Sequence, residues 1–129
     1  MKYLILFFLT ISTLFANSSK EILLLHSYNN GLKWSDGITS GVKEVLEKYP
    51  DYELSIEYMD SKKIDTKEYL ESLTNLYEKK FSSRKYEVVI TADNYAYEFA
   101  LKNHKKIFNS SNIVFCGVEN FDKTSIQKS

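Results

Sequence analysis

The chain has 129 residues, which is one domain at most, and its 17 lysine and arginine residues balance 17 aspartate and glutamate residues. A neutral chain lacks the basic excess that draws a protein to a phosphate backbone, so we expect no nucleic-acid partner. Apolar residues make up 43% and aromatic residues 15%, which is typical of a packed globular chain. The single cysteine, Cys116, excludes an intrachain disulfide and any site built from several thiolates.

The first sixteen residues have the pattern of a secretory signal. Lys2 precedes an apolar run from Tyr3 to Ile11, and Ala16 is a small residue where a signal peptidase can cut. The run is shorter than the roughly 20 residues that a membrane-spanning helix needs. We therefore expect residues 1–16 to be a signal peptide. Residues 17–129 are then expected in the periplasm or another extracytoplasmic space.

The next part of the chain predicts a strand, a helix and a second strand. Residues 21–26 are a continuous apolar run, which indicates a strand that is buried on both faces. The predicted helix carries Ile38, Val42, Val45 and Tyr49 at helical spacing, and Pro50 stops it. Residues 52–59 alternate between apolar and polar side chains, as an edge strand does.

A second helix, a third strand, a third helix and a fourth strand follow. Asp65 and Glu68 resemble a capping box, and the helix after them should end near Ser82. Its apolar stripe consists of Tyr69, Leu70, Leu73, Tyr77 and Phe81. Residues 86–91 and 112–116 predict two more strands buried on both faces. Between them, Asp93 or Asn94 is expected to cap a helix whose inner face carries Ala96, Phe99, Ala100 and Asn103.

This alternation predicts an α/β fold, with a parallel sheet of about four strands and helices on both of its faces. With the second strand at an edge, the expected strand order is 2-1-3-4. Ligands bind such sheets beyond the carboxyl ends of the strands, where the winding direction changes. The loops that follow His26, Ile90 and Cys116 are rich in polar and aromatic residues. We expect these three loops to meet at one end of the sheet.

The loops lack the motifs of common nucleotide, metal or nucleophile chemistry. Only Gly31 falls in the first loop, and both the dinucleotide fingerprint and the phosphate-binding loop motif are absent. A triad of His26, Ser27 and Asp93 fails because neighbouring residues on a strand point to opposite faces. The second histidine, His104, has no partner at metal-ligand spacing. We expect no catalytic residue, no metal and no cofactor.

Binding fits these loops better than catalysis. Tyr28 and Trp34 either offer flat faces to an organic ligand or cover the end of the sheet. Asp93 and Asn94 either hydrogen-bond a ligand or cap the third helix, and Glu119 lines the cleft or meets a hinge. The predicted ligand-binding residues are Ser27, Tyr28, Trp34, Asp93, Asn94 and Glu119.

Residues 24–36, 92–99 and 114–121 resemble the first lobe of the ABC-transporter substrate-binding-protein-like family. That family includes free periplasmic proteins and the extracytoplasmic input domains of sensor histidine kinases and diguanylate cyclases. The resemblance implies a clamp of the type I periplasmic-binding-protein kind, which catches a small molecule between two α/β lobes. Residues 17–129 are expected to be the N-terminal lobe, with the second lobe missing, so the chain is interpreted as a fragment or a truncated product.

Two uses of such a clamp remain open, together with one alternative from another class. In transport, the clamp delivers its solute to a membrane permease. In sensing, it acts on a tethered transmembrane signalling module. The alternative is a small flavodoxin-like enzyme.

Overall fold

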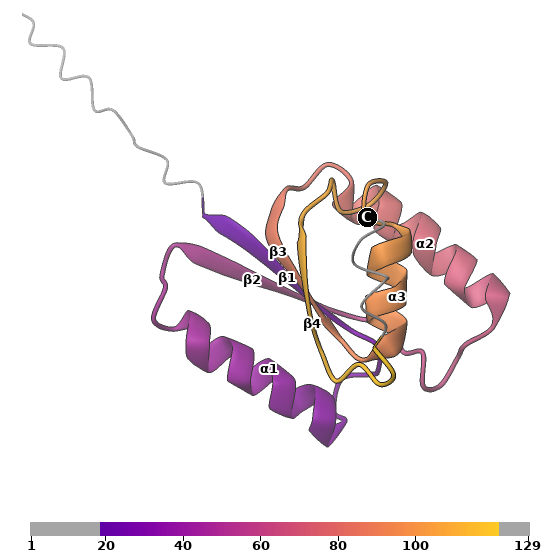
Figure 1. The fold of residues 1–129 in the computed structure, drawn as a ribbon, viewed down its shortest axis with the longest axis horizontal. Helices are drawn as coiled ribbons and strands as arrows, with labels where there is room; N and C mark the ends of the chain where they lie inside the picture. Colours follow the sequence, from indigo (N-terminus) through magenta and orange to yellow (C-terminus); the bar gives the residue numbers. More distant parts are fainter. Residues whose placement is uncertain (1–18, 122–129) are drawn as a thin grey trace, which may run out of the picture.

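A computed structural model of the chain describes residues 19–121, in which four parallel strands form one sheet with three helices packed on it (Figure 1). The strands are β1 (Lys20–His26), β2 (Tyr52–Tyr58), β3 (Tyr86–Ala92) and β4 (Asn112–Cys116). The helices are α1 (Lys33–Leu46), α2 (Lys67–Phe81) and α3 (Asn94–Lys102). The predicted signal peptide, residues 1–16, lies outside the described residues.

The strand order is β2-β1-β3-β4, which confirms the predicted α/β fold and its topology. Helices α2 and α3 lie on one face of the sheet and α1 on the other (Figure 1). The register sets the carboxyl ends of the strands level: His26 pairs with Tyr58 and with Ala92, and Ala92 pairs with Cys116. The loops that leave the strands therefore start from a common rim.

The main core lies between the sheet and the pair α2 and α3. Leu23, Leu25 and Val89 of the sheet belong to one buried cluster with the inner faces of both helices. These faces carry Leu73, Tyr77, Phe81, Ala96, Phe99 and Ala100, all buried as the apolar periodicity predicts. The hydroxyl of Tyr77 donates to the carbonyl of Tyr58, and burial raises the pKa of the Tyr77 phenol.

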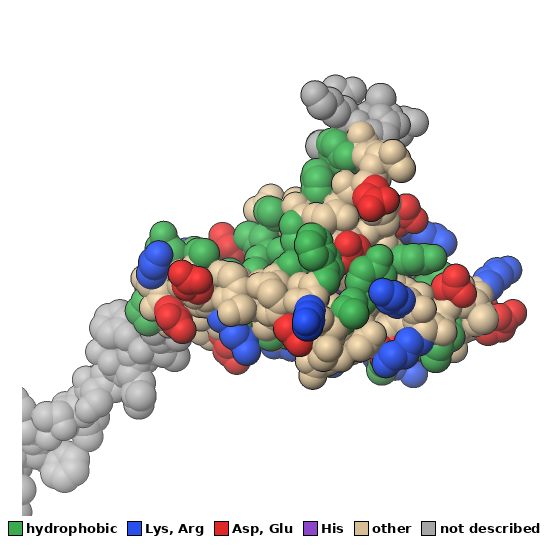
Figure 2. Space-filling view, turned by 90° about the horizontal axis from the view of Figure 1, so that it is seen from below, with side chains coloured by type: hydrophobic (Ala, Val, Ile, Leu, Met, Phe, Trp, Pro, Cys, Tyr) green, Lys and Arg blue, Asp and Glu red, His purple; other side chains and the backbone are tan. Residues whose placement is uncertain are grey.

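The opposite face is only partly covered. Val45 is 54% exposed, and α1 ends at Leu46, so the prediction that the helix continues through Tyr49 to Pro50 is wrong. Val114 on β4 is exposed too, which contradicts the predicted burial of residues 112–116 on both faces. The reason is that α1 is the only helix on this face among residues 19–121. Seen from below in Figure 2, the side on which α1 lies in Figure 1, hydrophobic side chains gather in the middle of the molecule.

Two helix caps differ from the sequence-based expectation. Thr66 caps α2 by accepting a hydrogen bond from the backbone N–H of Tyr69 at 3.3 Å, so the predicted capping box of Asp65 and Glu68 is wrong. Asp93 occupies the cap position of α3, but its side chain makes no cap hydrogen bond. The buried hydroxyl of Ser27, 69 residues away in sequence, accepts the Ala96 N–H in its place, at 2.8 Å.

Candidate ligand-binding site

A hollow of about 650 Å³ opens at the carboxyl ends of the strands, and we call it the rim pocket. Its lining residues are Tyr28, Leu32, Lys33, Trp34, Lys62, Asp93, Gly117, Val118 and Glu119. They come from the segments that follow β1, β2, β3 and β4, which the level register brings together. Four of the six predicted ligand-binding residues line it: Tyr28, Trp34, Asp93 and Glu119.

A hydrogen bond between two lining residues joins the first turn of α1 to the start of α3. The indole N–H of Trp34 donates to the Asp93 carboxylate at 2.9 Å, while the Trp34 side chain stays half exposed. Asp93 has φ 72° and ψ 171°, a conformation that is otherwise almost restricted to glycine and costs about 1–3 kcal/mol. Such strain persists where the surroundings enforce it, and it is common at ligand-binding sites. With Asp93 in this conformation, its side chain does not cap α3. The carboxylate instead accepts the hydrogen bond from Trp34.

The rim pocket is lined by two acidic residues, Asp93 and Glu119, and by two lysines, Lys33 and Lys62. Burial raises the pKa of the Asp93 carboxyl, the bond from Trp34 acts in the opposite direction, and Glu119 raises that pKa further. Burial, followed by the charges of Asp93 and Glu119, also raises the pKa of the Tyr28 hydroxyl. The thiol of Cys116 has its pKa raised by burial and by Asp93. The charge of Asp93 thus acts on the pKa of both Tyr28 and Cys116.

Ser27 and Asn94, the other two predicted ligand-binding residues, support the pocket from outside its lining. Ser27 is fully buried, and its hydroxyl donates to the Ala92 carbonyl at 2.7 Å while it accepts the N–H of Ala96. The side-chain amide of Asn94 donates to the Glu119 carbonyl at 3.1 Å and accepts the Glu119 N–H at 2.9 Å. Their hydrogen-bonding groups therefore hold the start of α3 and the loop after β4, and neither residue lines the rim pocket.

Sequence reasoning missed Lys33, Lys62 and Gly117. Lys62 lies in the loop after β2, with its ammonium nitrogen 5.5 Å from the centre of the Tyr28 ring. The strand order could have predicted Lys62. Because the second strand was expected beside the first, the loop that follows it was expected at the same rim of the sheet.

Gly117 is the point of closest approach in the pocket. It has φ +67°, and a Cβ atom there would lie 3.1 Å from both the Asp93 carboxylate and the Trp34 ring. We expect Gly117→Ala to lower the free energy of unfolding by about 1–2 kcal/mol. The substitution should also change Trp34 fluorescence. Chemical denaturation monitored by the single tryptophan measures both effects.

Gly41→Ala is the matched control for this substitution. Gly41 lies in α1, and a Cβ there meets no atom within 4 Å. Alanine should raise the free energy of unfolding at this site by about 0.5–1 kcal/mol through its better helix propensity. Equal responses of the two variants would contradict the close approach at Gly117.

His26 gives the fold a pH dependence of its own. Its ring is fully buried, stacks on Tyr58 at 5.0 Å between centroids, and shares a 2.9 Å hydrogen bond with the hydroxyl of Thr39. Burial lowers the His26 pKa from its ordinary value of 6.5, and the charge of Asp36 opposes that shift. Below pH 6.5 His26 is therefore protonated more fully in the unfolded chain than in the folded chain.

The free energy of unfolding should thus fall as the pH decreases from about 7 to 5, and more steeply in the parent chain than in His26→Gln. Denaturation at a series of pH values measures both slopes. Parallel pH profiles would show that His26 is not a buried neutral histidine.

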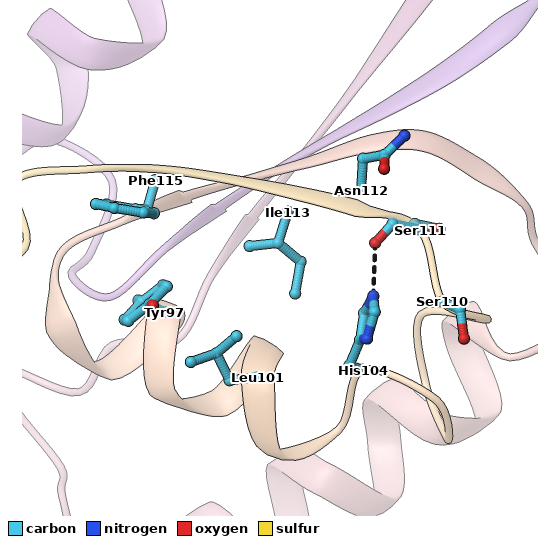
Figure 3. A pocket seen from close by; sticks show the side chains of 8 residues that line it. All are labelled: Tyr97, Leu101, His104, Ser110, Ser111, Asn112, Ile113 and Phe115. Atoms are coloured by element: carbon cyan, nitrogen blue, oxygen red, sulfur yellow. Dashed lines mark hydrogen bonds between the residues drawn. The ribbon is translucent and has the colours of Figure 1, made fainter. Parts of the chain in front are cut away.

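A second, smaller hollow of about 190 Å³ lies between α3 and β4. Figure 3 shows Tyr97 and Leu101 of α3 facing Ile113 and Phe115 of β4 across it. The Nε2 atom of His104 is hydrogen-bonded to the Ser111 carbonyl at 2.8 Å, so this nitrogen does not face a ligand with a free hydrogen-bonding group. The lining of this hollow contains no carboxylate, whereas Asp93 and Glu119 both line the rim pocket.

Comparison of the chain with protein-family models, with curated proteins and with solved structures found no match. The family resemblance rests on its sequence motifs alone. Within residues 19–121, no group of three or more histidine, cysteine or acidic side chains is placed to hold a metal ion. No helix in the same range is long and apolar enough to cross a membrane.

Proposed function

We propose that the rim pocket recognises a small organic molecule outside the cytoplasm, as the N-terminal lobe of an ABC-transporter-type substrate-binding protein. The observation that carries the proposal is the hydrogen bond from Trp34 to Asp93 at the mouth of the pocket. It joins the first turn of α1 to the residue that precedes α3, 59 positions away in the sequence, and leaves an aromatic face beside a carboxylate that is held in a strained backbone. Aromatic faces with a few fixed polar groups are the usual composition of a small-molecule site.

The partners of this lobe follow from the same proposal. A second lobe supplies the opposite wall and closes over the solute, because one wall alone leaves a ligand largely in water. The closed clamp then acts on a membrane permease or, in the sensing alternative, on a tethered transmembrane signalling module. A membrane-spanning segment and a kinase or cyclase domain encoded after the second lobe would favour sensing.

A thermal-shift screen tests the proposal on the purified chain. The library comprises amino acids, sugars, purines, amines and organic anions, each at millimolar concentration because one wall binds weakly. A solute at about ten times its Kd adds about 1.4 kcal/mol to the free energy of unfolding. For a domain of this size, that raises the Tm by several degrees.

Trp34→Ala should abolish the shift that a binding solute causes. The control is Val45→Ala, which lies in the same helix and removes a side chain of similar exposure, 54% against 52% for Trp34. The control should keep the shift. A shift that survives in Trp34→Ala, or no shift with any compound, would count against recognition at this pocket.

A further inference from the structure

We infer that the solute taken by the rim pocket is an organic cation, with its ammonium group held between the Asp93 carboxylate and the faces of Tyr28 and Trp34. This inference rests on the proposed function and adds the chemical class of the ligand.

The first argument is that the carboxylates of the pocket lack a cationic partner. Across residues 19–121, neither Asp93 nor Glu119 forms a salt bridge with a lysine or arginine, although Lys33 and Lys62 line the same hollow. Asp93 is partly buried, and within the described part of the chain its side chain accepts one hydrogen bond, from the neutral indole of Trp34. A carboxylate that has lost water without gaining a cation is stabilised strongly when a cation arrives.

The second argument is that an aromatic face of the pocket already carries a cation. The Lys62 ammonium lies 5.5 Å from the centre of the Tyr28 ring, within the range of a cation–π interaction. Negative charge from Asp93 and Glu119 reaches the Tyr28 hydroxyl, since both groups raise its pKa. The position over this ring therefore favours positive charge, and a ligand ammonium can replace the tethered lysine there.

An anionic ligand fits the same residues less well. The amino end of α3 would by itself attract an anion through the positive end of the helix dipole. Asp93 lies at that end and repels one, and Glu119 adds a second negative charge to the pocket lining. Lys62 is engaged with Tyr28.

Three probes that share a benzyl or phenyl group separate the possibilities: benzylamine, which is a cation at neutral pH, benzyl alcohol, which is neutral, and benzoate, which is an anion. Each is titrated into the isotopically labelled chain at low salt, and binding is followed by NMR at the indole N–H of Trp34, the single tryptophan. We expect benzylamine to bind about five- to tenfold more tightly than the other two.

Two charge variants of the pocket sharpen the test. Asp93→Asn keeps an oxygen acceptor for the Trp34 indole and should weaken benzylamine binding about five- to tenfold. Lys62→Met removes the competing ammonium and should tighten it a few-fold. The matched control is Lys63→Met, which loses the same charge from a side chain paired with Asp60 at 3.9 Å and absent from the pocket lining, and should leave binding unchanged.

The two proposals fail in different ways. Tighter binding of benzoate or benzyl alcohol, or weaker benzylamine binding in Lys62→Met, would overturn the cation inference and leave recognition at the pocket standing. Absence of binding by all three probes would overturn the cation inference. If the thermal-shift library also gave no hit, the proposed function would fail with it.

Discussion

Phe81→Ala is expected to lower the free energy of unfolding by about 3–5 kcal/mol, the usual loss for a buried phenylalanine. Phe81 is fully buried at the end of α2, where its ring contacts those of Tyr77, Tyr86 and Phe108. Three rigid rings cannot collapse into the space that the substitution leaves, so the cavity persists and the loss lies toward the upper end of the range. Urea denaturation of the purified variant measures it.

Leu76→Ala in the same helix is the control for this prediction. Leu76 is 56% exposed and contributes little to the core, so its replacement should change the free energy of unfolding by less than about 0.5 kcal/mol. Similar losses for Phe81 and Leu76 would mean that α2 does not pack on the sheet with the face described here.

Ser27→Ala is expected to cost about 2–3 kcal/mol although it removes a single oxygen atom. The substitution leaves the buried N–H of Ala96 without an acceptor and removes one of the two donors to the Ala92 carbonyl. Because Ala96 lies in the first turn of α3, that turn should loosen together with the neighbouring Asp93. Hydrogen exchange at the Ala96 amide and denaturant unfolding measure the local and the global effects.

Ser72→Ala serves as the comparison for Ser27. Ser72 is exposed on α2, and its hydroxyl donates to a carbonyl of the same helix, so alanine should change stability by less than about 0.5 kcal/mol. If Ser27→Ala were equally neutral, the cap that Ser27 provides to α3 would be absent in solution.

Much of the fold was predictable from local patterns. The continuous apolar run of β1 and the alternation of β2 were sufficient to place one strand inside the sheet and the other at its edge. The stripe from Tyr69 to Phe81 identified the buried face of α2. These features depend on residues that are close in sequence, and there periodicity reports burial directly.

Errors arose where a side chain is used by a distant partner. Asp93 looks like a helix cap in the sequence, but its carboxylate accepts a hydrogen bond from Trp34. The Ala96 N–H in the first turn of α3 donates to the Ser27 hydroxyl instead. The sequence offers the Asn94 side chain for a ligand or for the helix cap, and in the structure its amide is hydrogen-bonded to the backbone of Glu119. Neither pairing has a local signature, because each joins residues more than 20 positions apart.

The misplaced part of the first helix has a different cause. The spacing of Val45 and Tyr49 is that of an inner face, but the helix ends at Leu46 and is the only described helix on its side of the sheet. How much of a sheet one helix covers depends on the whole arrangement, so periodicity alone did not predict the exposure of Val45 and Val114.

The most direct test of recognition at the rim pocket is an NMR titration of the labelled chain with the strongest hit of the solute screen. The account predicts that the largest shifts occur at the Trp34 indole, at the amides of Tyr28 and Asp93, and through residues 117–119. Shifts centred instead on Leu101, His104 and Ile113, between α3 and β4, would contradict it.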